Sequence, residues 1–199
     1  MFTNGGYMFR SSKRGQIEVI CGCMFSGKTE ELLRRVKRVQ IANQKFQLIR
    51  SERDTRGSLE NLCVHYGISQ PVLAVSDSQK LRELIAPDVE VVAIDGAHFF
   101  DKGIVDVCGE LADGGVRVII AGLDLNFRGE PFEVMSILMA KAERLDKLSA
   151  ICMVCGKEAT RTQRLVKGEP APYDDPILLV GGSEMYEARC RSCHQVPKP

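Results

Sequence analysis

The sequence predicts an α/β fold, in which a mostly parallel sheet is covered by helices on both faces and followed by a smaller C-terminal domain. Two observations predict this organisation. Short apolar segments of strand character alternate with helical patterns from residue 16 to about residue 121, which is typical of βαβ units. Two matched Cys-x-x-Cys pairs then mark a change of character after residue 151. We therefore expect a flexible tail at 1–15, a main domain at 16–150 and a second domain at 151–199.

The main domain opens on a glycine-rich loop between its first strand and first helix. Gln16 to Cys21 has the pattern of a short buried strand, and helical spacing runs from Lys28 to about Asn43. Between them lies Gly-Cys-Met-Phe-Ser-Gly-Lys-Thr, the P-loop pattern in the strand–loop–helix context that it requires. Backbone N–H groups of such a loop, together with the helix N-terminus, hold phosphate oxygens. The domain is therefore predicted to be P-loop NTPase-like, with phosphate contacts from Gly22, Cys23, Met24, Phe25, Ser26, Gly27, Lys28 and Thr29.

Three side chains carry the chemistry that this loop implies. Lys28 can reach the outer phosphates of a nucleoside triphosphate, and the Thr29 hydroxyl can sit on a magnesium ion. The apolar strand pattern at 89–94 ends in Asp95, where P-loop enzymes keep a second group associated with magnesium. Thr29 and Asp95 are therefore the predicted magnesium residues.

The remaining elements of the main domain follow from the same patterns. Strands are expected at 45–49, 71–75 and 116–121, helices from residue 76 or 77 to 86 and at 104–112, and a long loop at 50–70. Ligands lie outside the carboxyl ends of the strands in such sheets. The P-loop, Asp95 and the 122–132 loop are therefore expected to meet at one cleft.

The second domain is predicted to be a zinc-binding domain. Its two Cys-x-x-Cys pairs are the arrangement of a structural zinc site with four thiolates, which leaves no coordination position open for catalysis. Four unrelated buried thiols are the alternative, which the matched spacing disfavours. An apolar strand pattern, glycines and Tyr186 lie between the pairs, and this stretch can fold over a flat ligand as a zinc-held lasso. The predicted zinc ligands are Cys152, Cys155, Cys190 and Cys193.

Composition limits the classes of partner. The net charge of +1 gives no electrostatic reason to expect nucleic acid or an anionic membrane as a partner. Apolar runs are shorter than a membrane span needs, and the N-terminus has no apolar signal-peptide core. Eight cysteines without an export signal indicate reduced thiols or metal ligands, not disulfides. We therefore expect a cytoplasmic protein.

Dispersed motifs carry a resemblance over roughly residues 16–196 to the thymidine kinases of the cellular, zinc-containing type. The matches include the P-loop, Asp54-x-Arg56 and Asp95 followed by Phe99-Phe100. Other matches lie at 121–124, 127–132, 161–164, 175–177 and 180–182, with Tyr186 and the four cysteines. The resemblance implies ATP-dependent 5′-phosphorylation of thymidine or deoxyuridine, with magnesium, in a homotetramer.

The resemblance also implies roles for individual positions. Lys28 and Arg56 lie near the transferred phosphate, and the stretch after the strand, Asp95, Gly96, Ala97 and His98, adjoins the phosphates. The base pocket and the lasso over the nucleoside are implied to be formed by Phe99, Phe127, Phe132, Thr162, Val180, Gly181, Gly182, Ser183 and Tyr186. Core packing is the alternative role for the phenylalanines.

One departure from the family pattern bears on turnover. The family has Asp-Glu-x-Gln-Phe-Phe, and here Gly96 stands at the glutamate that accepts the 5′-hydroxyl proton. General-base assistance contributes about 10²–10⁴-fold in rate, so we expect a thymidine kinase with impaired turnover. His98 is a candidate substitute base, since a neutral imidazole accepts protons near neutral pH. The alternative function is a catalytically silent nucleotide-binding protein, regulatory or sensory; a P-loop ATPase with another acceptor is disfavoured by Phe127, Tyr186 and the zinc-held lasso.

Overall fold

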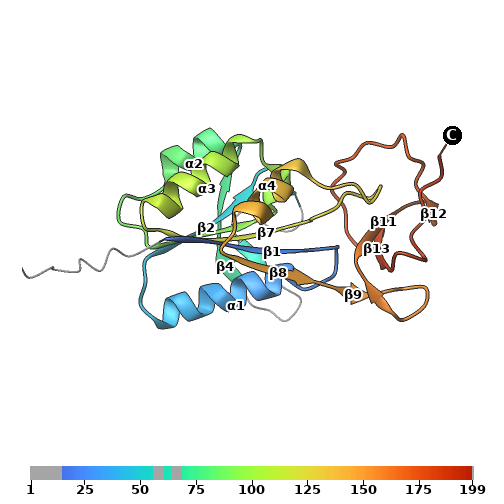
Figure 1. Ribbon diagram of the computed structural model, residues 1–199, viewed down its shortest axis with the longest axis horizontal. Coiled ribbons are helices and arrows are strands. Elements are labelled where there is room, and N and C mark those ends of the chain that lie inside the picture. Colours follow the sequence, from blue (N-terminus) through green and yellow to red (C-terminus); the bar gives the residue numbers. More distant parts are fainter. Residues whose placement is uncertain (1–14, 56–60, 64–68, 199) are drawn as a thin grey trace, which may run out of the picture.

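The computed structural model describes residues 15–55, 61–63 and 69–198. Within these ranges the centre is a six-stranded sheet of order β5-β2-β6-β7-β1-β8, in which all neighbouring strands run parallel. Figure 1 shows the sheet between helices, so the predicted α/β fold is confirmed. The strands are β1 (Gln16–Gly22), β2 (Phe46–Ser51), β5 (Leu73–Val75), β6 (Val91–Asp95), β7 (Arg117–Gly122) and β8 (Arg144–Leu148).

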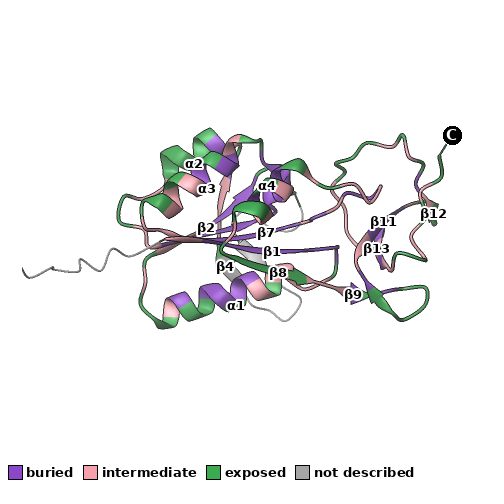
Figure 2. Cartoon of the chain, viewed as in Figure 1, coloured by how far each residue is buried: buried purple, intermediate pink, exposed green. Residues whose placement is uncertain are grey.

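Helices cover both faces of the sheet and bury a separate apolar core on each. Helix α1 (Lys28–Ile41) lies alone on one face, where Leu32, Val36 and neighbouring apolar residues of the helix pack against the sheet. On the opposite face lie α2 (Ser78–Leu84), α3 (Gly103–Asp113) and α4 (Glu133–Lys141), over a second core (Figure 1). The central strands β6 and β7 are buried except at Arg117, the first residue of β7 (Figure 2), which explains why their sequences are mostly apolar. None of the helices in the described ranges combines the length and the apolar composition needed to cross a bilayer.

The segment between β2 and α2 differs from the predicted loop and strand. A short antiparallel ribbon of β3 (Asn61–Cys63) and β4 (Ser69–Pro71) interrupts the expected loop. Because Pro71 ends this ribbon, the sheet strand β5 begins only at Leu73. Helix α2 is capped by Asp77, whose carboxylate accepts the Lys80 backbone N–H at 2.8 Å. The expected tail at 1–15 lies almost wholly outside the described residues.

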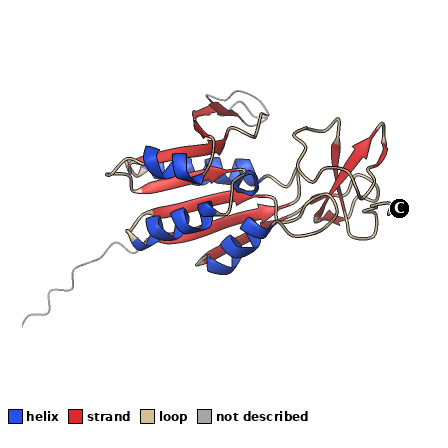
Figure 3. Cartoon of the chain, turned by 90° about the horizontal axis from the view of Figure 1, so that it is seen from above, coloured by secondary structure: helices blue, strands red, loops and turns tan. Residues whose placement is uncertain are grey.

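A C-terminal region of short strands lies beyond the carboxyl ends of the sheet strands, as Figures 1 and 3 show. Its core is a three-stranded antiparallel sheet of order β12-β11-β13 beside a β9–β10 hairpin. The strand predicted from the apolar run at 178–180 is wrong, because that run has no regular secondary structure and no strand partner among the described residues. The strands are β9 (Ala150–Ile151), β10 (Glu158–Ala159), β11 (Arg161–Val166), β12 (Glu169–Pro170) and β13 (Tyr186–Arg189).

A buried charge network fastens α1 to the edge of the sheet formed by β1 and β8. The Arg35 guanidinium lies 2.7 Å from Glu18, 2.9 Å from Glu31 and 2.7 Å from Asp146. Burial alone would raise the pKa of the Glu18 carboxyl, but hydrogen bonds from Arg117, Gln16 and Arg35 hold that pKa below its usual value. These contacts explain how β8, whose sequence is mostly polar, is held as an edge strand.

Replacing Arg35 with methionine is expected to lower the free energy of unfolding by about 3–5 kcal/mol, because it leaves the buried Glu18 carboxylate short of a partner. The matched control is Arg34→Met, one residue earlier on α1. Arg34 pairs with Glu31 but its side chain is 56% exposed, so its loss is expected to lower the free energy of unfolding far less than the loss of Arg35. Urea denaturation of both variants tests the difference; equal losses would contradict the role given to Arg35.

Candidate active site and metal centre

The P-loop runs from the end of β1 to the start of α1, and its backbone requires glycine at both ends. Gly22 has φ +141°, and a Cβ there would stand 2.3 Å from the Leu148 carbonyl oxygen. Gly27 has φ +81°, in the left-handed region that glycine adopts readily. The Lys28 ammonium lies over the loop and donates to the Cys23 carbonyl oxygen at 2.6 Å. The loop thus has the strand–loop–helix geometry that the sequence predicts.

The two predicted magnesium residues lie together. Asp95 ends the buried strand β6, and the Thr29 hydroxyl donates to its carboxylate, at 3.3 Å from either oxygen. Hydroxyl and carboxylate oxygens are hard ligands of the kind that magnesium prefers. The chemistry of this pair therefore fits a magnesium ion, which Thr29 and Asp95 would hold and which would neutralise charge on nearby phosphates.

Gly96 follows Asp95 in a left-handed conformation, with φ +69° and ψ +36°, and opens the short 3₁₀ turn Ala97–Phe99. A Cβ at this position would lie 3.1 Å from Cδ2 of Phe99 and 3.6 Å from Oδ2 of Asp54. Asp54 is buried and forms an ion pair with Arg50 at 3.2 Å. The position of the family's glutamate therefore adjoins a second carboxylate. Arg56, predicted to lie near the transferred phosphate, is outside the described residues.

His98 is buried beside the pocket described below. Its Nδ1 accepts the Leu123 backbone N–H at 3.2 Å, and its ring lies between Phe99 and Phe132, with centroid distances of 4.2 and 5.1 Å. A neutral imidazole that accepts at Nδ1 carries its proton on Nε2. In this arrangement Nε2 is a donor, so a proton-accepting role for His98 requires the bond to Leu123 to break.

A small aromatic pocket adjoins the P-loop and the 123–132 loop. It encloses about 30 Å³, enough for one or two water molecules, so a nucleoside requires the lining segments to move apart. Of the residues predicted for the substrate, those lining the pocket are Phe99, Phe127, Phe132, Thr162, Val180, Gly181 and Tyr186. Gly182 and Ser183 are not part of the lining; Ser183 is exposed in the turn before β13.

Several pocket residues are absent from the predicted substrate set. Met24 belongs to the P-loop yet lines the pocket, and Arg164 lines it from β11. Arg164 could have been predicted from the sequence, because it is the last residue of the family match at 161–164. His98, which was predicted to adjoin the phosphates, lines the pocket as well. The other additions are Leu123, Leu125, Asn126, Ile177, Leu178 and Leu179, whose apolar or common side chains carry no signal of their own.

The C-terminal region contacts the P-loop directly. The Met24 backbone N–H donates to the Thr162 hydroxyl at 3.0 Å, and the Cys23 thiol donates to the Ala159 carbonyl oxygen at 3.3 Å. Cys23 also packs in the small core of the C-terminal region, with Cys152 and three alanines. The phosphate loop and the aromatic pocket are therefore parts of one continuous site.

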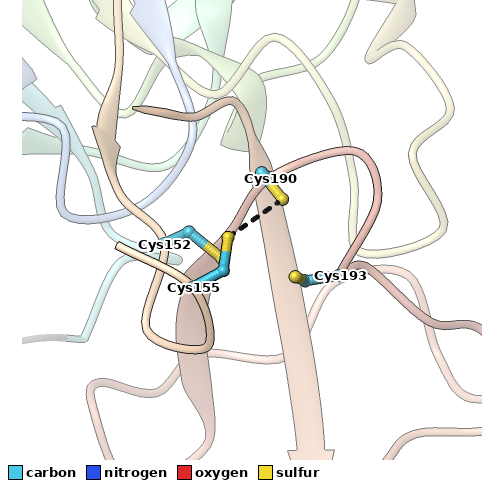
Figure 4. Close-up of side chains that lie close together, drawn as sticks. All are labelled: Cys152, Cys155, Cys190 and Cys193. Carbon is cyan, nitrogen blue, oxygen red and sulfur yellow. Dashed lines mark hydrogen bonds between the residues drawn. The ribbon is translucent and has the colours of Figure 1, made fainter. Parts of the chain in front are cut away.

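The four predicted zinc ligands converge at one point, as Figure 4 shows. All four sulfur atoms lie within 4.8 Å of one another, and those of Cys155 and Cys190 are 3.6 Å apart. Zn–S bonds of about 2.3 Å place tetrahedral sulfurs about 3.8 Å apart, so the cluster fits a zinc ion. Burial would raise the pKa of the Cys152 thiol, but backbone hydrogen bonds from Cys190, Cys155 and Val154 lower it to about 6. Among the cysteines whose side chains are described, none forms a disulfide.

The family model of thymidine kinase matches residues 15–194. Domain III of the replication initiation protein DnaA from Thermotoga maritima is similar over 69% of this chain and 56% of that chain, with 16% identity and a TM-score of 0.42. The cytoplasmic domain of the Type VII secretion ATPase EccC from Thermomonospora curvata is similar over 75% of this chain and 22% of that chain, with 13% identity and a TM-score of 0.43. The chain thus spans just over half of the first structure and about a fifth of the second, and both TM-scores lie below 0.5.

The family match begins at the edge of β1 and continues to the residue after the last cysteine. It therefore includes the P-loop, the Thr29–Asp95 pair, the aromatic pocket and the four-cysteine cluster. The chain belongs to the thymidine kinase family.

Proposed function

We propose that this protein transfers the γ-phosphoryl group of ATP to the 5′-hydroxyl of thymidine or deoxyuridine. The observation that carries the proposal is the hydrogen bond from the Met24 N–H to the Thr162 hydroxyl. It joins the phosphate-binding loop to the wall of the aromatic pocket, and a phosphate donor and a flat nucleoside can therefore be held against each other. The family match supports this pairing of substrates.

In the proposed reaction the nucleoside 5′-oxygen bonds to the γ-phosphorus as the bond from that phosphorus to the ADP oxygen breaks. Lys28 and the P-loop N–H groups stabilise charge on the phosphate oxygens. Thr29 and Asp95 are the proposed holders of magnesium, which would neutralise part of that charge. Phe99, Phe127 and Phe132 are the proposed base-pocket residues. The segment 176–181, to which the name lasso is restricted from here on, closes over the nucleoside, with Tyr186 behind it.

Turnover is proposed to be slower than in relatives that keep the glutamate, because Gly96 has no carboxylate to take the hydroxyl proton. The proton then passes to water or to a phosphate oxygen, and the loose transition state of phosphoryl transfer makes positioning matter more than base strength. Gly96 is also the observation that favours the second candidate, a nucleotide-binding protein without turnover. The family resemblance further supports a cytoplasmic homotetramer.

ATP-dependent conversion of thymidine to its monophosphate by the zinc-loaded protein tests the proposal. We expect measurable turnover in the parent and a loss of about 10²–10³-fold in Lys28→Met, the usual effect of removing one preorganised group at developing charge. Lys37→Met, on the exposed side of α1, is the control and should match the parent. Thymidine and ATP binding without any product would favour the nucleotide-binding protein, and turnover of a non-nucleoside acceptor alone would contradict both.

A further inference from the structure

Arg164 is a buried arginine at the centre of the C-terminal region. It lies on β11, is 1% exposed, and is among the largest fully buried side chains of the described residues. Burying a guanidinium is costly unless its donors are satisfied. The partners of Arg164 therefore indicate what its charge is used for.

Those partners belong to the lasso and to the pocket wall. The guanidinium donates to the backbone carbonyl oxygens of Pro176 and of Ile177, the latter at 2.9 Å. Its Nε and Nη2 donate to the Tyr186 hydroxyl at 3.1 and 2.8 Å. That hydroxyl in turn donates to the Leu179 carbonyl oxygen at 2.5 Å. Arg164 thus connects β11 with two carbonyls of the lasso directly, and with a third through Tyr186 of β13.

Aromatic rings complete the surroundings of the guanidinium. Its central carbon lies 4.2 Å from the centroid of the Phe127 ring and 5.2 Å from that of Tyr186, within the range of cation–π attraction. Among the ion pairs of the described ranges, none joins Arg164 to a carboxylate. The guanidinium therefore acts through the fixed directions of its N–H donors. It holds backbone oxygens of a segment that forms no strand with the other described residues.

We propose that Arg164 is a positioning residue that holds the lasso at 176–181 over the nucleoside pocket. The expected effect on the KM for thymidine rests on the proposed function. The lasso has no regular secondary structure, and Ile177, Leu178 and Leu179 are 40–43% exposed, so little apolar burial holds it in place. Without Arg164 this segment has to be ordered by each arriving nucleoside, which weakens binding.

The test compares Arg164→Met and Arg164→Lys with Arg161→Met, a control on the same strand whose side chain does not line the pocket. In Arg164→Met we expect the rate of limited proteolysis within 177–181 to rise about tenfold or more, and the KM for thymidine to rise about tenfold or more. The KM for ATP and the zinc content should stay at parent values. Lysine keeps the charge but not the fork of donors, so Arg164→Lys should resemble Arg164→Met.

Tyr186→Phe is a second, milder variant, because it removes only the hydroxyl that links Arg164 to Leu179. It should accelerate proteolysis within 177–181 to a smaller extent. An unchanged rate of cleavage within the lasso in all three variants would overturn the proposal, as would cleavage spread evenly over the C-terminal region with loss of zinc. Limited proteolysis needs no substrate, so a parent protein without thymidine turnover would contradict the proposed function and leave this readout able to decide the role of Arg164.

Discussion

Replacing Cys155 with serine is expected to remove zinc, unfold the C-terminal region and lower thymidine turnover by about 10²-fold or more, the scale of loss when a reacting group is misplaced. Structural zinc contributes about 10–16 kcal/mol of folding free energy in small zinc domains, which exceeds what the few alanines and thiols of this core can replace. The Cys155 side chain is exposed, so its loss acts through the metal and not through packing. The exposed neighbour Val154 is the matched control, and Val154→Ser should keep zinc and activity.

The loss of zinc is also expected to reach the phosphate loop. Cys23 packs among the residues around the cluster, and the Met24 N–H is bonded to Thr162 on β11. Unfolding of the C-terminal region therefore removes the contacts that hold two successive P-loop residues, Cys23 and Met24. In Cys155→Ser, calorimetry should show weaker ATP binding while circular dichroism retains the helical signal of the main domain. ATP affinity equal to that of the parent in a zinc-free variant would contradict this connection.

The sequence predicted the P-loop, the Thr29–Asp95 pair and the central strands because local residues determine them. Each central strand is covered on both faces, so it is apolar throughout and is recognised without its neighbours. The zinc cluster is likewise encoded by spacing within two short segments. Such features do not depend on where the rest of the chain passes.

The features that the sequence did not predict depend on distant partners. Strand β8 is polar because it lies at the edge of the sheet, and Asp146 holds it through Arg35, 111 residues away. The apolar run at 178–180 has strand character but no strand beside it in the part of the chain that the structure describes, and its side chains line a pocket instead. Arg164 resembles a surface arginine in sequence, because the groups that bury it, the lasso carbonyls, Phe127 and Tyr186, lie elsewhere in the chain. Phe99, Phe127 and Phe132 all line the pocket, and Phe132 also packs against the core beneath α3 and α4, so their role in binding a base stays a prediction.

Restoring a carboxylate by Gly96→Glu is expected to raise kcat for thymidine by about 10²-fold or more, within the range of general-base assistance. The new side chain starts beside Asp54, whose Oδ2 lies 3.6 Å from the Cβ position. Two neighbouring carboxylates raise the pKa of one of them, which brings that group closer to the pKa of an effective base at neutral pH. The gain should appear in kcat more than in the KM for thymidine, since the proton is transferred only in the chemical step.

The same substitution is also expected to lower the stability of the fold. Measuring stability beside kcat therefore separates the effect of backbone strain from the effect of the added carboxylate. Residue 96 has φ +69° and its Cβ would approach Phe99 to 3.1 Å. A side chain in the left-handed region costs about 1–2 kcal/mol, which corresponds to a fall in Tm of roughly 2–8 °C for a chain of this size. Gly96→Ala is the matched control: it carries the same backbone strain and the same contact with Phe99, but no carboxylate. It should therefore lose stability to a similar extent without any gain in kcat.

The pair of variants decides which group takes the proton in this protein. A gain in Gly96→Glu and none in Gly96→Ala means that the cleft is complete except for its base, because the P-loop, the magnesium pair and the pocket then work as soon as a carboxylate is added. An unchanged kcat in Gly96→Glu, with ATP and thymidine binding intact, would contradict the proposed impairment, since a resident group must then accept the proton already. His98 could be that group only if its Nδ1 bond to Leu123 is exchanged during the reaction, because the neutral ring otherwise presents a donor at Nε2.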